Sequence, residues 1–512
     1  MIRRIGTACA AVATAALIAG ASFAVPASAA APCTGKPAGG DWPVYGHDNA
    51  NTRSQPVSQG IGPDAVGSLK TAWVFSTAST GDNSGFESTP VVSGGCVFVG
   101  SYNGYAYGLD ATSGKLIWQR KLDVAKVGFG GALVGAPVVN GNAVIYLVNV
   151  DGGPYTIALN RSTGAVLWRS DVLVNKPAGA FQGYYTNASP IVADGLVVAG
   201  YSAPEGDSSK TGGFALIDPG TGAIVKVTET IPPADQAKGY AGGGLWSTPA
   251  YDPQTKYLYW GAGNPSSKDK EHPNTDAIIK IDLDRSHATF GQIVGSYEGN
   301  VDQYTDTLET LSHTPVCSAT DNNSIPQPLD DPACGQLDLD FGDSANLFTN
   351  SKGEKLVGDL QKSGVYHAAH ADTMKPAWSN IVGVSCQVCN AASSAYDGKS
   401  IYGGATPEGA EYALNRDDGS VGWLAPLFEP VHFQSTSVAD GVVWSLDDYA
   451  NLNAWDAASG KPLARRALTV DAGARVSNMT SSGVAIAQHT VFAAAGGLGT
   501  NTDTGYVLAY RP

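Results

Sequence analysis

The chain has 512 residues, of which 43% are hydrophobic and 15% are charged. Its 63 glycines and 29 prolines suit turns and short strands, and they argue against a coiled coil or a helical solenoid. The formal charge of -15 repels phosphate groups, so binding to nucleic acids or to anionic membrane surfaces is a poor hypothesis.

The first 30 residues have the pattern of an export signal. Arg3 and Arg4 precede the apolar, Ala-rich stretch 5–25, and residues 26–30 supply the small side chains of a signal-peptidase site. A membrane anchor is the alternative, which the length and flanks of the stretch favour less. We therefore expect removal of residues 1–30, a single domain over 31–512 without a membrane span, and a periplasmic or secreted location.

An exported chain with an even number of cysteines is expected to form disulfides. Cys9 lies in the signal, and six cysteines remain, which allow 15 pairings. Close spacing favours the pairs Cys386 with Cys389 and Cys317 with Cys334, leaving Cys33 with Cys96. The C-x-x-C at 386 could instead be redox-active or bind zinc. Because Asn390 follows it, the covalent haem motif is absent.

One pattern recurs about eight times along the chain. It consists of a Thr/Ser/Ala-Pro or similar start, two apolar strands, and an Asp/Asn-x-x-x-Gly turn that a tryptophan often follows. The segments 110–118, 160–168 and 415–423 show the full ending, whereas the turns at 218–222 and 456–460 are followed by Lys226 and Ala464 in place of the tryptophan. The Asp or Asn caps its own backbone and the glycine takes a positive φ, so these are hairpin turns.

Repeats of 40 to 60 residues made of short strands indicate an all-β protein, an eight-bladed β-propeller of four-stranded antiparallel blades. The last repeat ends one strand short, and the N-terminal strand 69–75 is expected to close the ring and remove its free edges. A longer gap predicts an insertion at roughly 285–340. The repeats are expected to open near Thr89, Ala136, Ser189, Thr248, Ala345, Ala392, Ser435 and Val476.

Polar residues break the repeat at several predicted strand ends. They lie in the segments 200–206, 261–265 and 338–342, followed by Lys362 in the segment 360–364. The carboxylates and the carboxamide would form an oxygen cage suited to a hard cation such as calcium, with a lysine beside it. Taken singly, each residue is more typical of a turn or a solvated loop.

Together these residues resemble the cofactor site of the pyrroloquinoline-quinone (PQQ) dependent alcohol dehydrogenases, the quinoproteins, with the polyvinyl alcohol dehydrogenase branch nearest. The opening Asp41-Trp42-Pro43-Val44-Tyr45-Gly46-His47-Asp48, with Asn51-Thr52-Arg53, resembles the N-terminal signature of that family. The repeat endings resemble its tryptophan-docking motifs, and the resemblance covers essentially the whole mature chain.

The resemblance implies a metal ion held by Glu205, Asn264 and Asp340. The ion would be Ca2+, or a lanthanide if the Asp338 and Asp340 pair supplies an extra carboxylate. The catalytic base of the family sits in a motif that Leu339-Asp340-Phe341-Gly342 resembles, so Asp340 is the expected base, and Asp338 is the alternative.

The resemblance also implies four residues around the quinone. Trp246 lies 18 residues before Asn264, where the family has the tryptophan that forms the floor under the ring. Lys362 matches the basic residue at the quinone oxygens, where it would stabilise negative charge. Ser202 and Glu87 match further cofactor contacts. The adjacent cysteine pair of the methanol-oxidising members is absent from this sequence.

The function implied is oxidation of primary or secondary alcohols, polyvinyl alcohol among them, with electrons passed to an external acceptor such as a cytochrome. Two other classes are weighed against it. A non-catalytic exported propeller that binds proteins would have no need for Glu205, Trp246, Asn264, Asp340 and Lys362 together. A hydrolase using Asp338 and Asp340 as acid and base would hold them closer together than a typical inverting pair.

Overall fold

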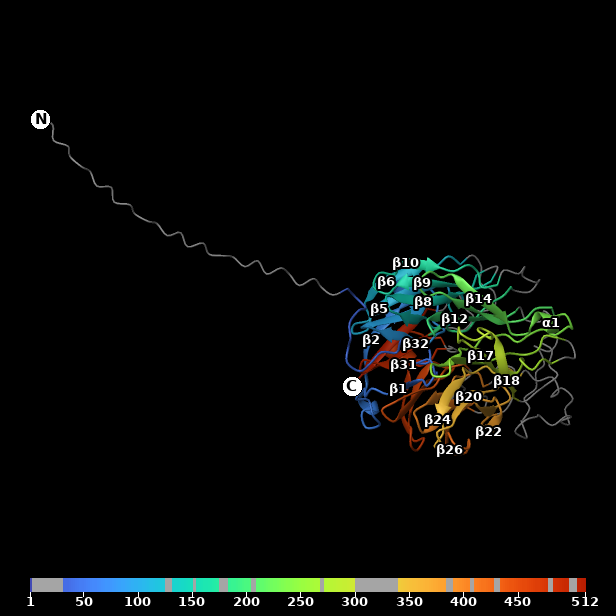
Figure 1. Cartoon of the computed structure of the whole chain (residues 1–512). Coiled ribbons are helices and arrows are strands. Elements are labelled where there is room, and N and C mark those ends of the chain that lie inside the picture. Colours follow the sequence, from blue (N-terminus) through green and yellow to red (C-terminus); the bar gives the residue numbers. More distant parts are fainter. Residues whose placement is uncertain are drawn as a thin grey trace. The chain divides into compact units, whose positions relative to one another are not determined.

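The computed structural model describes Met1 and residues 31–124, 131–150, 153–174, 183–203, 209–267, 271–299, 339–383, 390–405, 409–427, 433–477, 482–496 and 504–512. The chain divides into two units, Met1–Ala31 and Pro32–Pro512. The second unit is an eight-bladed β-propeller, as the repeats predict, and its blades follow one another in chain order (Figure 1).

Each blade is an antiparallel sheet of four strands, and in blades 1 to 7 the strands follow chain order from the inner edge to the outer edge. Blade 1 is β3 (Val91–Ser93), β4 (Cys96–Gly100), β5 (Tyr105–Asp110) and β6 (Leu116–Lys121); blade 2 is β7 (Val138–Asn140), β8 (Ala143–Val148), β9 (Tyr155–Asn160) and β10 (Val166–Arg169). Blade 3 is β11 (Ile191–Ala193), β12 (Leu196–Tyr201), β13 (Gly213–Ile217) and β14 (Ile224–Glu229); blade 4 is β15 (Ala250–Asp252), β16 (Tyr257–Gly261), β17 (Ala277–Asp282) and β18 (Ile293–Glu298).

The second half of the ring follows the same plan. Blade 5 is β19 (Asn346–Thr349), β20 (Lys355–Leu360), β21 (Val365–His370) and β22 (Pro376–Ile381); blade 6 is β23 (Ala395–Tyr396), β24 (Ser400–Ala405), β25 (Ala410–Asn415) and β26 (Val421–Pro426). Blade 7 is β27 (Ser437–Ala439), β28 (Val442–Leu446), β29 (Asn451–Asp456) and β30 (Pro462–Ala467), and β1 (Ser54–Gln55) runs parallel to β27.

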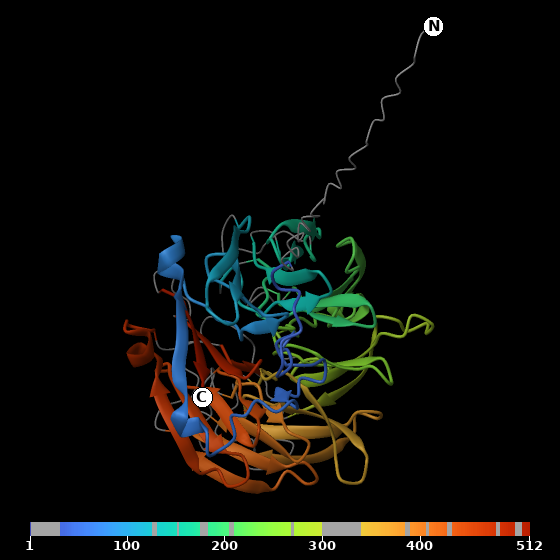
Figure 2. The ribbon, with the colours of Figure 1, turned by 90° about the vertical axis from the view of Figure 1, so that its left-hand side faces the viewer.

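Blade 8 is built from both ends of the chain. It holds β31 (Val484–Ala487), β32 (Thr490–Ala495) and β33 (Tyr506–Arg511), and the N-terminal strand β2 (Lys70–Ser76) pairs with β33 as its outer strand. In Figure 2 this blue strand lies beside the red strands. The prediction of a closing strand at 69–75 is confirmed, and the pairing leaves the ring without an open edge at the join.

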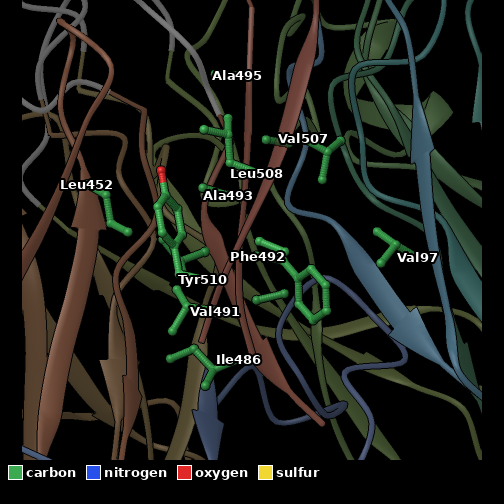
Figure 3. Packing of buried hydrophobic residues seen from close by; sticks show 14 of the residues in the cluster. Val97, Leu452, Ile486, Val491, Phe492, Ala493, Ala495, Val507, Leu508 and Tyr510 are labelled. Carbon is green, nitrogen blue, oxygen red and sulfur yellow. The ribbon is translucent and has the colours of Figure 1, made fainter. Parts of the chain in front are cut away.

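Apolar side chains fill the space between neighbouring blades. Figure 3 shows Phe492, Leu508 and Tyr510 of blade 8 in one cluster with Val97 of blade 1 and Leu452 of blade 7. Strand β32 is fully buried along its length because sheets cover both of its faces. Its sequence, Thr-Val-Phe-Ala-Ala-Ala, therefore shows no alternation of polar and apolar residues.

Tryptophans on the outer strands explain the Asp-x-x-x-Gly turns. A Cβ on Gly114 would stand 2.5 Å from the Trp73 ring, so only glycine leaves room for the indole of the preceding blade. The indole N–H of Trp73 donates to the carbonyl of Ala111 in the same turn at 3.1 Å. Trp118, Trp168, Trp378 and Trp423 cover Gly164, Gly222, Gly419 and Gly460 in the same way.

The two predicted exceptions to the tryptophan pattern are present. Lys226 covers Gly291 of blade 4 with its aliphatic stem, and its ammonium group donates to the Phe290 carbonyl. Ala464 lies on β30 of blade 7, at the position after the turn that tryptophan occupies elsewhere.

The segment Trp42–Gln55 hydrogen-bonds to all eight blades in chain order. In each blade the segment bonds to the inner strand, at its second residue or, in blade 8, at its third. Figure 2 shows the dark-blue segment passing from the green blades to the orange ones. The bonds join Trp42 to Val92, Pro43 to Val139, Asn49 to Val192 and Tyr251, Ala50 to Leu347, Thr52 to Tyr396, Arg53 to Val438 and Gln55 to Ile486. This single segment therefore ties the whole ring together.

Two of the predicted boundaries are wrong. The insertion expected at roughly 285–340 begins too early, because β18 occupies Ile293–Glu298 and supplies the fourth strand that blade 4 needs. The last repeat does not open near Val476, since this buried residue belongs to the connection after the short helix α2 (Leu468–Ala472). The inner strand of blade 8 begins at Val484 instead.

Helices are short in the described residues. They are α1 (Pro233–Gln236), α2, and the 3-10 turns η1 (Val66–Ser68) and η2 (Thr77–Thr80). Within the described ranges, no helix has the length and apolar character needed to cross a bilayer.

A disulfide joins Cys33 to Cys96, which confirms that predicted pair. The bond fixes the start of the N-terminal segment to strand β4 of blade 1. Cys317, Cys334, Cys386 and Cys389 lie outside the described residues, so their two pairings stay predictions.

Replacing Asn51 by alanine should destabilise the ring by roughly 3 kcal/mol, because two buried carbonyls lose their donor. The side-chain amide of Asn51 donates to Thr248 O in blade 4 at 3.0 Å and to Ala345 O in blade 5 at 3.1 Å. Its φ of 54° adds a penalty for alanine. Urea unfolding measures the loss. Asn142→Ala, at an exposed hairpin turn, is the matched control and should cost under about 0.5 kcal/mol; equal losses would contradict the prediction.

Glu411 makes stability depend on pH. Burial raises the pKa of this carboxyl to about 7, and the hydrogen bond from Thr436 opposes the shift. Between pH 4.5 and 7 the folded chain keeps a proton that the unfolded chain loses, so raising the pH favours unfolding. Between pH 4.5 and pH 8 this carboxyl should lower the free energy of unfolding of the wild type by about 3 kcal/mol, and Glu411→Gln should lack this loss. Urea unfolding of both proteins at pH 4.5 and pH 8 tests it, and parallel pH profiles would contradict it.

Candidate active site

Asp340 and Lys362 form a buried ion pair at the start of blade 5. Lys362 Nζ lies 2.8 Å from Asp340 Oδ2, and each residue is 8% exposed. The backbone N–H of Lys362 also donates to the carbonyl of Asp340 at 2.9 Å. Asp340 precedes the inner strand and Lys362 follows β20, so the fold brings together two residues 22 positions apart.

The other oxygen of the Asp340 carboxylate contacts blade 4. The backbone N–H of Asn264 donates to Asp340 Oδ1 at 2.5 Å. Asn264 follows strand β16, and its own carbonyl accepts the N–H of Gly243 at 2.8 Å. The predicted metal ligands Asn264 and Asp340 are therefore neighbours, held by donors from two blades.

The Trp246 ring lies against this pair. The ammonium group of Lys362 is 5.4 Å from the centre of the ring, within the range of a cation–π contact. A Cβ on Gly263 would stand 3.0 Å from Asp340 Oδ1 and 3.3 Å from Trp246 Nε1, and a Cβ on Gly342 would stand 2.6 Å from the Trp246 ring. The two glycines thus leave the space in which the indole and the carboxylate meet.

Hydroxyl groups lock the loops that carry these side chains. The N–H of Thr248, two residues after Trp246, donates to Ser344 Oγ at 3.0 Å, and the N–H of Ser344 donates to Ser393 Oγ at 3.2 Å. Thr248 Oγ1 in turn accepts the N–H of Ser189 in blade 3 at 3.2 Å. The Ser or Thr at the start of several repeats therefore forms a hydrogen bond from one blade to the next. These bonds fix the positions of the loops that carry Trp246 and Asp340.

Asp343 anchors the Asp340 loop through hydrogen bonds to Ser344 and Ser394. Its carboxylate accepts the N–H of Ser344 at 2.5 Å and the hydroxyl of Ser394 in blade 6 at 2.8 Å. Burial raises the pKa of Asp343 to about 7, against these hydrogen bonds. The buried guanidinium of Arg53 acts on this carboxyl through its charge, so the N-terminal segment reaches the base of the loop.

Ser202 is adjacent to the loop that bears Trp246. Its side chain is buried, and a Cβ on Gly244 would stand 2.6 Å from Ser202 Oγ. This hydroxyl makes no hydrogen bond within the described part of the chain. Buried hydroxyls are normally hydrogen-bonded, so this one is available to a polar ligand or to water, and its predicted contact with the cofactor stays a prediction.

Glu87 is buried in blade 1, in the loop before β3. It lies near Tyr102, whose pKa is raised by burial and, to a smaller extent, by the charge of Glu87. Its role at a cofactor stays a prediction. Glu205 and Asp338 lie outside the described residues, so the third metal ligand and the choice between Asp338 and Asp340 also stay predictions.

Asn390 belongs to the site although no pattern in the sequence singles it out. This fully buried residue has a φ of 55°, and its side-chain amide donates to the carbonyl of Lys362 at 3.2 Å. Its place directly after Cys389 was the available signal, but it served only to exclude a haem motif. A single asparagine after a turn carries no periodicity, so spacing alone does not select it.

The assembled side chains fit a flat anionic cofactor with a hard cation. An indole face, an ammonium group and the unsatisfied hydroxyl of Ser202 suit a planar ring bearing oxygens. The oxygens of Asp340 and Asn264 suit Ca2+ or a similar ion. Within the described ranges, no three His, Cys, Asp or Glu side chains are placed so that they could hold a metal ion. Of the predicted ligands, Asn264 is an amide and Glu205 lies outside those ranges.

Sequence comparisons show which known proteins this chain resembles. A family model described as outer membrane protein assembly factor BamB matches residues 66–260. Quinohemoprotein alcohol dehydrogenase ADH IIB of Pseudomonas putida is 31% identical over 46% of this chain and 35% of its own length. Lanthanide-dependent methanol dehydrogenase of Methylacidiphilum fumariolicum is 28% identical over 45% of this chain and 41% of its own. The chain thus matches only about a third to two fifths of each of these relatives.

Solved structures share the fold. Quinohemoprotein alcohol dehydrogenase from Comamonas testosteroni superposes with a TM-score of 0.68 at 15% identity, covering 92% of this chain and 80% of that one. A europium-containing methanol dehydrogenase gives 0.68 at 16% identity, with 92% and 98% covered, whereas BamB from Moraxella catarrhalis gives 0.52 at 13%, with 87% and 98% covered. The chain is therefore a homologue of the quinoprotein alcohol dehydrogenases over nearly half its length, and it has their eight-bladed propeller fold.

Proposed function

We propose that the protein is a PQQ- and metal-dependent dehydrogenase that oxidises primary or secondary alcohols. The observation that carries the proposal is the convergence of four predicted residues from two blades: Asp340 lies 2.8 Å from Lys362 and 2.5 Å from the N–H of Asn264, with Trp246 against the lysine. The relatives are named as alcohol and methanol dehydrogenases, which supports the same reaction class. We propose Ca2+ as the ion, with a lanthanide as the alternative.

Each residue of the site has its own role in the proposed reaction. PQQ, when bound with its metal, supplies a carbonyl carbon that accepts hydride. Asp340 would remove the proton from the alcohol hydroxyl as the general base. With the cofactor bound, Lys362 would stabilise negative charge on a quinone oxygen, and Trp246 would hold the ring and exclude water from one face. Glu87 and Ser202 would bind the cofactor, and Glu205, Asn264 and Asp340 would hold the cation.

We propose that the protein works outside the cytoplasm and passes electrons to a separate acceptor such as a cytochrome. The disulfide between Cys33 and Cys96 supports an oxidising compartment. One relative, from Thauera butanivorans, is named 1-butanol dehydrogenase (cytochrome c), and it supports an acceptor of that class. Polyvinyl alcohol belongs among the substrates to be tested because of the resemblance in sequence.

A propeller that only binds proteins is the second candidate. The match of residues 66–260 to the BamB description favours it, because that name belongs to an assembly factor. A scaffold does not need a buried ion pair between Asp340 and Lys362 with a tryptophan ring against the lysine. Cofactor binding therefore separates the two candidates.

The purified protein should reduce a redox dye with an alcohol only when PQQ and Ca2+ or a light lanthanide are both present. Asp340→Asn should lower kcat by roughly a hundredfold to ten-thousandfold, as loss of a general base does. Steady-state rates across small alcohols and polyvinyl alcohol provide the measurement. Asp338→Asn is the matched control: loss of activity there, with Asp340→Asn active, would make Asp338 the base. No turnover with any metal would leave the scaffold as the better description.

Replacing Trp246 by alanine should weaken PQQ binding to the apoprotein by roughly tenfold, because the ring loses its stacking surface. Trp246→Phe should recover most of the affinity. Isothermal titration calorimetry gives both dissociation constants without turnover. Trp378→Phe, at a docking position between blades 5 and 6, is the control and should leave the affinity unchanged. Equal affinity in Trp246→Ala and wild type would remove Trp246 from the cofactor site.

A further inference from the structure

A carboxyl group that the proposed reaction does not use lies directly behind the Asp340 loop. Asp359, on strand β20, is fully buried, and neither of its oxygens has a hydrogen-bond partner of good geometry in the described part of the chain. An apolar residue of similar size would avoid the cost of burying such a group. The groups that surround the carboxyl indicate what it does there.

The Asp359 carboxyl and the Phe341 peptide share one small space. A Cβ on Gly261 would stand 2.7 Å from Asp359 Oδ2, 2.8 Å from the carbonyl oxygen of Phe341 and 2.9 Å from Phe341 Cβ. Phe341 is the residue after Asp340, and its own N–H donates to Ala262 O at 3.3 Å. The carboxyl and the peptide that follows the proposed base therefore both border the same glycine, Gly261.

No described cation serves Asp359. His367 lies opposite it in the β20·β21 register. Its Nδ1 bonds Tyr297 at 2.9 Å, its Nε2 makes no hydrogen bond in the described part of the chain, and burial lowers the pKa of His367 to about 3, so its ring is neutral. The guanidinium of Arg53 donates instead to carbonyls and hydroxyls of the ring centre. A carboxylate in this place would be an uncompensated buried charge.

The charges around Asp359 favour its neutral form. Burial, and then the charge of Asp343, raise the pKa of Asp359 well above the usual range, and the N–H of Leu360 opposes them more weakly. The other titratable groups that interact with it are the phenols of Tyr366 and Tyr412, both uncharged because burial raises their pKa. A neutral carboxylic acid has an O–H to donate, and the Phe341 carbonyl is an acceptor beside it.

We propose that Asp359 carries a proton, donates its O–H to the carbonyl oxygen of Phe341, and is thereby a positioning residue for Asp340. The bond would complete the support of the loop, since Lys362 N–H already bonds the Asp340 carbonyl and Asp343 anchors the next turn. The role of Asp340 itself rests on the proposed function, whereas the support of the loop does not.

Asparagine and leucine at position 359 test this bond. Asn keeps the shape and donates an N–H, so Asp359→Asn should retain kcat within about threefold, whereas Asp359→Leu should lower kcat at least tenfold with the Kd for PQQ changed less than threefold. Hydrogen exchange of the apoprotein, followed by mass spectrometry, should show faster exchange in a peptide covering 339–345 for Asp359→Leu and wild-type exchange for Asp359→Asn. Glu411→Gln, a buried acid of blade 6 away from this loop, is the control and should leave that peptide unchanged.

The protonation state has its own measurement. A folded-state pKa above the unfolded value means that wild-type stability falls as the pH rises above about 4, and Asp359→Asn lacks this loss. The melting temperature of Asp359→Asn relative to wild type should therefore rise from pH 5 to pH 8.

Three results would overturn the proposal: wild-type exchange and kcat in Asp359→Leu, failure of Asp359→Asn to restore them, or a difference in melting temperature that does not change with pH. If no variant or wild type turns over alcohol, the exchange and melting data still decide the support of the loop. Failure of the proposed function and failure of this inference are thus told apart.

Discussion

The contact of one N-terminal segment with every blade is the constraint on which the structure depends. Trp42–Gln55 bonds to blades 1 through 8 in order, and Arg53 is buried among carbonyls and hydroxyls at the centre. A ring of separate sheets has only side-chain packing between neighbours, and a shared backbone partner fixes their heights relative to one another. The loops at the starts of the inner strands, where Trp246 and Asp340 lie, inherit that alignment.

The candidate site shows what such alignment makes possible. The oxygens of Asp340 accept from Lys362 and from the N–H of Asn264, so two blades must hold their height to within hydrogen-bond tolerance. Hydroxyls of Ser344 and Ser393 carry the alignment from blade to blade. The glycines at 263 and 342 then leave room for the indole. Backbone bonds and buried side-chain hydrogen bonds together set the geometry of the site.

Buried acids are a second theme of the interior. Asp343, Asp359 and Glu411 are all fully buried, and Arg53 is the cation that acts on Asp343. Burial raises the pKa of Asp343 and of Glu411 to about 7. Neutral acids can donate hydrogen bonds as well as accept them, which lets them support loops where an ion would repel the backbone carbonyls.

The repeat pattern by itself determined the fold, because a strand pattern with Asp-x-x-x-Gly turns and docking tryptophans is local and recurs. It also placed the closing strand, and the resemblance to a family selected Asp340, Lys362, Trp246 and Asn264 as one group. The repeat pattern could not identify single residues that do not recur. Asn390, Asp343 and Asp359 act through neighbours that are distant in sequence. The boundary of the insertion was misplaced because an outer strand such as Ile293–Glu298 is half exposed and weakly patterned. Only the tertiary structure decided which donor meets which acceptor, since hydrogen bonding across blades depends on distances that spacing along the chain does not fix.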